Sequence, residues 1–298
     1  SQRVSPTKPL MHMYLKTDGT PVDTDQVGIN DEFTDRDPRL AWTVQGPGHE
    51  WVKGGVTGLK PLNFTFTNTG YMFMKWNQEF EENYVTGRGD NSVPIFRLGE
   101  VLLNYAEAKA ELGEMDKSIW NETIGALRER VGVKNIYPED SGYVADPWLA
   151  SYYGKAEGAA VTTLSNTILE IRRERVCEMM LEARRTDDLY RWHCANLIVE
   201  RDGQKDGWRG LYLTADEAKN GIDYNGYHYT FQKGTTDPNN YSVTGNVADR
   251  AWKFSEGDHG YLVYQITLRW DERMYVRPIP TSALSLNPKL GQNYGWEQ

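Results

Sequence analysis

The histidines and cysteines are the first residues of this chain that could carry chemistry, and they are dispersed. Only His193 and Cys194 are neighbours, with Cys177 in the preceding helix-like stretch. A metal cluster or a Cys–His nucleophile can be drawn from these three, but we favour small buried thiols on a core helix. The chain has no His-Glu-x-x-His, phosphate loop, dinucleotide fingerprint or Gly-x-Ser-x-Gly elbow. The sequence therefore predicts no metal site and no cofactor.

The 42 Asp and Glu residues are the other candidates for chemistry. A glycoside hydrolase needs two carboxyl groups about 5 to 9.5 Å apart across the sugar bond, one of them with a raised pKa. The adjacent pairs Asp187-Asp188 and Asp271-Glu272 do not supply that opposed geometry, and so many acids produce pairs by chance. We predict that the chain has no catalytic residues and is not an enzyme. A glycoside hydrolase is the least favoured alternative.

Aromatic residues with a polar atom are unusually frequent: the chain has ten Trp and eighteen Tyr against eight Phe. Sugars present apolar C–H faces on which a flat ring can stack, while nearby polar side chains bind the hydroxyl groups. The formal charge of −9 argues against a nucleic acid or an anionic membrane surface as partner, because both need clustered cations. Composition therefore indicates recognition of a ligand other than nucleic acid.

The helices that would position these residues are predicted in the middle of the chain. Apolar residues recur at three- and four-residue spacings from Leu98 to Leu112, which predicts a helix that ends at Gly113. A second helix is predicted to end near Gly132, and residues 163–198 give a long third one, continuous or bent. The Ala-Glu-Leu-Gly stretch between the first two resembles the turn of a tetratricopeptide unit.

The flanking segments are predicted to be irregular. Gly and Pro punctuate residues 1–94, which indicates loops and short strands, and residues 201–298 combine loop and strand signals with a proline-rich tail. We therefore predict a mainly α fold with tetratricopeptide-type helical hairpins, long irregular loops and small β elements. Residues 95–200 would form the helical core, and the tail would pack on the helices.

The third predicted helix carries a regular charge pattern. Glu174, Glu178 and Glu182 follow one another at four-residue spacing, with Arg175 and Arg185 nearby. These charges fit a solvated face or a partly buried network of ion pairs equally well. Neither interpretation makes them catalytic.

Four segments, in one order over nearly the whole chain, resemble the SusD/RagB family. They are the Asp-Pro-Arg-Leu stretch within residues 33–40 with the Gly-Pro-Gly of 46–48, residues 97–108 with 127–132, the Glu- and Arg-rich residues 174–192, and residues 278–296. The departures are mild: Gly99 stands where a larger residue is usual, and Asp187 where an aromatic is common. Members are normally about twice this length and begin with a lipoprotein signal, so the resemblance implies that residues 1–298 are a C-terminal region.

The resemblance implies a non-catalytic protein that binds oligo- or polysaccharides at the cell surface. Its expected partner is a SusC-like, TonB-dependent outer-membrane transporter, and its expected anchor is a lipid on an N-terminal part outside this chain. A peptide- or protein-binding helical scaffold of the same fold is the alternative.

Family glycan sites include aromatic residues on loops upstream of the Glu-Val-Leu-Leu helix. The resemblance therefore implies a ligand-binding site at Trp42, Trp51, Tyr71 and Trp76. Four aromatic residues further along the chain are reserve candidates: Trp148, Tyr152, Tyr153 and Trp208. Ordinary partial burial is the competing interpretation for each of these residues.

Overall fold

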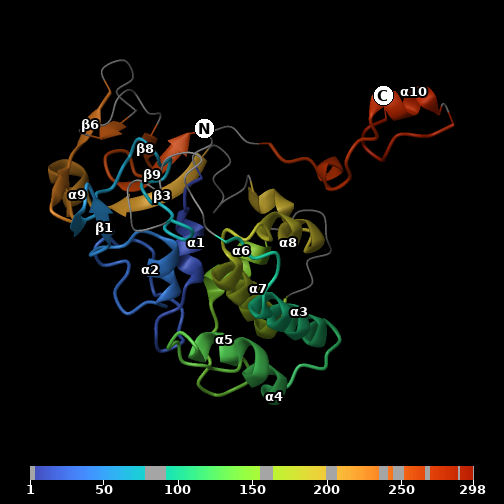
Figure 1. The fold of residues 1–298 in the computed structure, drawn as a ribbon. Helices are drawn as coiled ribbons and strands as arrows, with labels where there is room; N and C mark the ends of the chain where they lie inside the picture. Colours follow the sequence, from blue (N-terminus) through green and yellow to red (C-terminus); the bar gives the residue numbers. More distant parts are fainter. Residues whose placement is uncertain are drawn as a thin grey trace.

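A helical half and a β-rich half lie side by side in the computed structural model (Figure 1). Helices take 36% of the chain and strands 16%, so the prediction of a mainly α fold is not confirmed. None of the described helices combines the length and the apolar character that crossing a bilayer would require. The structure describes residues 4–77, 92–154, 164–198, 207–234, 241–243, 252–265, 269–287 and 289–297.

Helix α7 (Asn166–Met179) is the centre of the helical half. It begins where the Ser165 side chain accepts a hydrogen bond from the Ile168 amide, a standard N-cap. Every residue from Ile168 to Met179 is buried, so neighbouring elements enclose the helix. The helices that pack against it are α1 (Lys8–Met13), α2 (Arg39–Thr43), α3 (Leu98–Glu111) and α6 (Pro147–Gly154).

Helix α3 pairs with a second helical run, as the sequence predicts. The run consists of α4 (Lys117–Trp120), the π-helical η2 (Asn121–Gly125) and α5 (Ala126–Glu129). Leu103, Trp120 and Ile124 share one buried core between the two segments. Gly113 and Gly132 follow the two segments with φ of 69° and 80°, the left-handed conformation that glycine adopts at helix ends. The tetratricopeptide character of this hairpin remains a prediction.

The outer face of α3 is apolar and exposed. Leu98, Val101, Tyr105 and Leu112 keep between 45% and 70% of their surface in solvent. The helix buries a different face, on which Leu103 lies. Most of the apolar stripe that predicts this helix therefore points away from its core.

The predicted long helix of residues 163–198 is bent after α7. Leu181 and Ala183 have φ of 60° and 59°, which ends regular helical geometry. The chain then forms α8 (Arg185–Arg191) and the 3₁₀ helix η3 (Ala195–Ile198).

The β-rich half is built on a five-stranded antiparallel sheet in the order β3-β9-β8-β7-β6. Tyr241, Val243, Trp252 and Phe254 are buried at alternate positions, and Phe64 packs edge-on against Trp252 at 5.8 Å. The sequence predicted only small β elements here, and three of the five strands are three residues long. The strands are β3 (Gly207–Leu213), β6 (Phe231–Lys233), β7 (Tyr241–Val243), β8 (Trp252–Phe254) and β9 (Gly260–Gln265).

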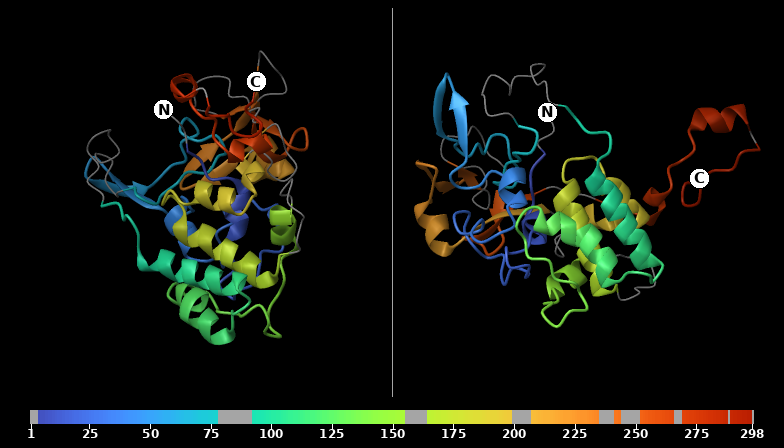
Figure 2. Two further views of the ribbon diagram at one scale, coloured as in Figure 1. Left: turned by 90° about the vertical axis from the view of Figure 1, so that its right-hand side faces the viewer. Right: turned by 60° about the horizontal axis from the view of Figure 1, so that its bottom comes forward.

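Two hairpins accompany the sheet. One consists of β1 (Glu50–Lys53) and β2 (Val56–Leu59), and it projects from the body of the molecule (Figure 2). The other consists of β4 (Ile222–Tyr224) and β5 (Tyr227–Tyr229), after helix α9 (Ala215–Asn220). Both are antiparallel.

Up to Tyr275 the C-terminal tail contacts the helical half, as the sequence led us to expect, since Tyr275 packs edge-on against Tyr190 at 5.6 Å. Beyond Tyr275 it extends away from the helices (Figure 1). It contains η4 (Glu272–Tyr275) and α10 (Thr281–Leu286), and no residue of α10 is buried. η4 still contacts the helical half, because the Ala195 amide donates to the Tyr275 hydroxyl at 2.8 Å. The residues after η4 bond to the tail itself. The Ile279 amide donates to Gln292 Oε1 at 2.6 Å, and Trp296 Nε1 donates to the Val276 carbonyl at 2.8 Å.

Candidate functional site

A buried group of ion pairs joins α2 to α7. Arg39 Nη1 donates to Glu174 at 2.5 Å and to Glu178 at 2.9 Å, and its Nη2 donates to Asp37 at 2.7 Å. All four side chains are buried. Of the two interpretations of the charge pattern on this helix, the structure therefore shows the buried one.

Arg128 on α5 extends this group. It donates to Glu174 at 2.9 Å and to Glu170 at 2.7 Å. We call Arg39, Arg128, Glu170, Glu174 and Glu178 the ion-pair network. Burial alone would raise the pKa of Glu174, but the two arginines outweigh that effect and lower it. A carboxyl group held ionised in this way cannot serve as a general acid.

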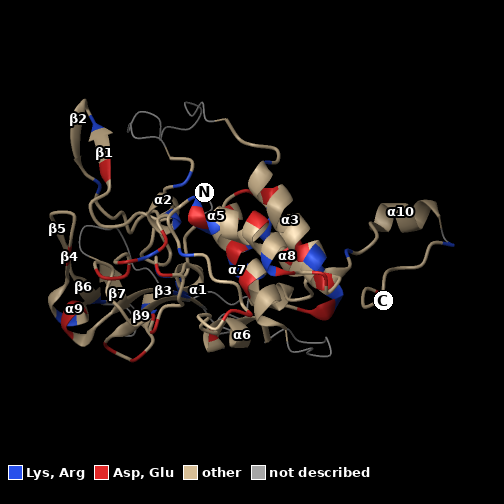
Figure 3. Ribbon diagram, turned by 90° about the horizontal axis from the view of Figure 1, so that it is seen from below, with Lys and Arg blue, Asp and Glu red and all other residues tan. Residues whose placement is uncertain are grey.

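Arg97 connects the ion-pair network to Glu182, because its Nη1 also donates to Glu178 at 2.5 Å. Lys75 Nζ lies 2.5 Å from one oxygen of Glu182, and Arg97 Nε lies 2.7 Å from the other. The next residue, Trp76, donates from Nε1 to the Leu181 carbonyl at 3.1 Å. Figure 3 shows residues of both charges side by side on α7 and α8. The network thus fixes the segment that carries Trp76.

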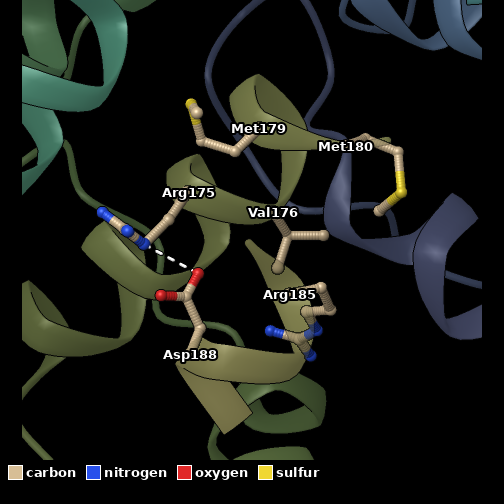
Figure 4. A pocket seen from close by; sticks show the side chains of 6 residues that line it. All are labelled: Arg175, Val176, Met179, Met180, Arg185 and Asp188. Carbon is tan, nitrogen blue, oxygen red and sulfur yellow. Dashed lines mark hydrogen bonds and ion pairs between the residues drawn. The ribbon is translucent and has the colours of Figure 1, made fainter. Parts of the chain in front are cut away.

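A small pocket between α7 and α8 contains charged groups that already have partners (Figure 4). Arg175 donates to Asp188 at 2.7 Å and to Asn104 at 2.6 Å, and Arg185 donates to the Tyr153 hydroxyl at 3.1 Å. We interpret the pocket as a packing gap. Its lining residues are Arg175, Val176, Met179, Met180, Arg185 and Asp188.

The thiols and the histidine that could suggest a metal or a nucleophile are not arranged for either. Cys177 and Cys194 are buried free thiols, and burial raises the pKa of each. His193 instead lies 3.3 Å from Glu272. Within the part of the chain that the structure describes, no group of three His, Cys, Asp or Glu residues is placed to hold a metal ion.

Three of the four sequence-predicted ligand residues have rings that reach solvent. Trp42 on α2 is 60% exposed, Trp76 is 36% exposed, and Trp51 on β1 is partly exposed. Tyr71 has to be removed from the site, because it is fully buried. Its hydroxyl donates to Glu32 and accepts from Lys8, so the ring offers no face to a ligand.

A short stretch of paired backbone brings Trp42 close to Trp76. The carbonyl of Thr43 accepts from the amide of Met74 at 2.7 Å, and Val44 pairs with Phe73. Trp42 and Trp76 therefore each lie within two residues of the hydrogen bond between Thr43 and Met74.

The Lys60 side chain lies between Trp51 and Met74. Its Nζ lies 3.7 Å from Met74 Sδ and 5.6 Å from the centre of the Trp51 ring. We call Trp42, Trp51 and Trp76 the tryptophan surface.

The reserve aromatic residues lie elsewhere in the fold. Tyr152 and Tyr153 on α6 are buried. Trp148, on the same helix, stacks with His12 and with Tyr152, with ring centres 3.9 and 5.0 Å apart. Trp208 lies on β3. None of them joins the tryptophan surface.

Asn225 and Tyr227 are features of this region that the sequence interpretation missed. Asn225 accepts from the Gly48 amide at 2.8 Å and donates to the Lys60 carbonyl at 2.8 Å. It thereby holds the base of the β1–β2 hairpin, while Tyr227 is 48% exposed. Asn225 and Gly226 form the turn between β4 and β5, with φ of 50° and 80°. The Asn-Gly pair is the sequence signal that could have revealed this turn, because such pairs favour tight hairpins.

Comparison with known proteins identifies a family. The sequence pattern of the SusD family matches residues 1–296. A SusD-like protein from Bacteroides fragilis has a similar structure, with 19% identity, a TM-score of 0.60, and coverage of 98% of this chain and 47% of that one. A structure of the protein BT4246 gives 20% identity, a TM-score of 0.56, and coverage of 98% and 45%. The chain thus spans about half the length of these structures. No curated protein matches in sequence.

Proposed function

Because the chain belongs to the SusD family, we propose that it is a non-catalytic protein that binds glycans for nutrient uptake. Trp42, Trp51 and Trp76 would contact the ligand. The family has this general role, while the glycan and the residues that bind it are our proposal.

The exposure of the tryptophan surface is the observation that supports this proposal most strongly. Three large rings reach solvent on elements that are joined by hydrogen bonds and anchored to the buried ion-pair network. A flat ring can stack on the C–H face of a pyranose. Because the rings are already held in place, binding would lose little conformational entropy.

Family membership also supports a partner and a location. We propose that the whole protein works at the surface of the outer membrane as a lipoprotein, beside a SusC-like, TonB-dependent transporter. The glycan would pass from the tryptophan surface to that transporter.

The exposed stripe of α3 favours one alternative. Leu98, Val101, Tyr105 and Leu112 form an apolar face on one side of a hairpin that we propose to be of the tetratricopeptide type. Such a face suits an amphipathic polypeptide. A peptide- or protein-binding scaffold is therefore the second candidate.

A glycan array with the labelled chain tests the first proposal. We expect retention of at least one glycan class by the wild type, with strong loss in Trp51→Ala and Trp76→Ala. Tyr294→Ala is the matched control, because Tyr294 is an exposed aromatic residue of the tail. Binding that neither tryptophan substitution changes would reject the site. Release of new reducing ends from a bound glycan would reject the non-catalytic role.

A further inference from the structure

We propose that Tyr227, on the β4–β5 hairpin, is a further glycan-binding residue, and that the site takes an oligosaccharide long enough to reach from Trp51 to Tyr227. This inference deepens the proposed function and rests on it, because Trp51 belongs to the tryptophan surface. It adds a residue and a hairpin that lie outside that surface.

The register of the β4–β5 hairpin places Tyr227 at the open end of a buried face. Tyr224 pairs with Tyr227, and Ile222 pairs with Tyr229. Paired residues and residues two apart share one face of a hairpin, so these four side chains point the same way. Ile222, Tyr224 and Tyr229 are buried, whereas Tyr227 is 48% exposed. The face that packs against the protein therefore ends in one ring that reaches solvent.

Hydrogen bonds place this face against the segments that lead into β1 and out of β2. The Tyr224 hydroxyl donates to the Gln45 carbonyl at 3.2 Å, and the Tyr229 hydroxyl donates to the Leu62 carbonyl at 3.1 Å. Burial raises the pKa of Tyr229 to about 12, and the nearby Tyr227 hydroxyl adds to that rise. The Tyr227 hydroxyl thus lies near that of Tyr229, on the side of the hairpin that faces these segments.

The turn that carries Tyr227 is held in place by its neighbour Asn225. The Asn225 side chain accepts from the Gly48 amide and donates to the Lys60 carbonyl, both at 2.8 Å. The β4–β5 hairpin therefore lies beside the base of the β1–β2 hairpin (Figure 3). Because the turn is already fixed, ordering Tyr227 for a ligand would cost little conformational entropy.

Lys60 connects this turn to Trp51. Its carbonyl bonds to Asn225, and its Nζ lies 5.6 Å from the centre of the Trp51 ring. The two residues from Asn225 to Tyr227 span at most about 7 Å. The rings of Trp51 and Tyr227 are thus separated by no more than one lysine side chain and one tight turn. One sugar unit covers one ring, so a ligand that contacts both rings must be an oligosaccharide.

The side chain of Tyr227 is open to a ligand. Among the residues that the structure describes, none hydrogen-bonds to its hydroxyl, and no aromatic or cationic group stacks on its ring. A sugar needs an aromatic plate for its C–H face and a polar atom for a hydroxyl group. A half-exposed tyrosine with an unbonded hydroxyl offers both.

The test compares short and long oligosaccharides of one sugar. Laminaribiose and laminarihexaose, maltose and maltohexaose, and mannobiose and mannohexaose are titrated calorimetrically into the wild-type chain, together with the matching pair for any other class that the array retains. We expect the hexasaccharide of at least one pair to bind about tenfold more tightly than its disaccharide. In Tyr227→Ala this gain should disappear, while the disaccharide affinity stays within about twofold.

Two further variants separate the ring from the hydroxyl and from a general effect of surface tyrosines. Tyr227→Phe keeps the plate and loses only the hydroxyl, so the hexasaccharide affinity should fall about threefold. Tyr105→Ala is the matched control, because Tyr105 is 45% exposed on α3, outside the proposed site. It should bind like the wild type. The melting temperature of each variant reports on folding, and if Tyr227→Ala fails to fold, Tyr227→Phe decides.

The outcomes separate this inference from the proposed function. An equal gain with length in the wild type and Tyr227→Ala, or hexasaccharides that bind no more tightly than disaccharides, would overturn the inference. If the same sugars still lost affinity in Trp51→Ala, the glycan-binding function would stand without it. If neither the oligosaccharides nor any glycan on the array bound, both would fail.

Discussion

The ion-pair network and the tryptophan surface both contain contacts made by cationic side chains, but with different kinds of partner. In the network, Arg39 and Arg128 are buried and each meets two or more carboxylates. On the hairpin, Lys53 Nζ and Lys60 Nζ lie 5.4 and 5.6 Å from the centre of the Trp51 ring. The buried arginines join α2 and α5 to α7, whereas the Trp51 ring beside the two lysines is one of the rings that we propose as ligand contacts. The ion-pair network therefore has a structural role, and the tryptophan surface is the part that we propose binds the ligand.

The largest effect that would test this contrast is expected in the network. Arg128→Met removes one of two cations from each of the buried Glu170 and Glu174, which keep only Arg173 and Arg39, so the free energy of unfolding should fall by about 3–5 kcal/mol. Lys117→Met is the control, because its pair with Asp140 is exposed and should contribute less than about 1 kcal/mol. Denaturant unfolding measures both. Similar small losses in the two variants would contradict a structural role for the network.

The next effect is on acid stability. Burial would raise the pKa of Glu174 and of Asp146, a buried residue that pairs with Arg173 of α7, but their cationic partners lower both pKa values below the ordinary range. The unfolded chain therefore binds protons first, and stability that is fully present at neutral pH declines as pH falls below about 4.5. The melting temperature, followed from pH 7 to pH 3, should show this loss. In Glu174→Gln, which starts lower, the decline should be shallower.

On the recognition side, Trp51→Ala should lower affinity for the bound glycan roughly tenfold or more, because the ring supplies a stacking plate. Its unfolding free energy should change by less than about 1 kcal/mol, since the ring is partly exposed and outside the main core. Calorimetric titration and thermal melting on one preparation would measure both. A variant that lost stability but kept its affinity would show that Trp51 supports the fold and does not bind the ligand.

The smallest effect concerns the link between the two regions. Asn225→Ala removes two hydrogen bonds that hold the base of the hairpin, which should cost about 1–2 kcal/mol of stability. Glycan affinity should fall only a few-fold, because the ligand residues themselves remain. An affinity equal to that of the wild type would show that the hairpin does not need this support to bind.

The contrast also explains what the sequence could predict. The helices around Leu103 and Ile171 are long and periodic, so their positions are predictable from spacing alone. The five-stranded sheet is not, because strands such as β7 and β8 take three residues each and pair across long separations. Local periodicity carries no information about such pairing.

Of the candidate site, too, the sequence could predict only a part. Trp42, Trp51 and Trp76 are exposed as a ligand site requires, whereas Tyr71 is buried by contacts with Lys8 and Glu32, distant in sequence. No local pattern could reveal those contacts.

Titration of indole N–H resonances would test the central claim most directly. With ¹⁵N-labelled tryptophan, each signal is assigned by a Trp→Phe substitution, and the glycan selected on the array is added. We expect the signals of Trp42, Trp51 and Trp76 to shift together, while those of the buried Trp120 and Trp252 stay in place. Saturable binding that left the signals of all three exposed tryptophans unmoved would contradict the account.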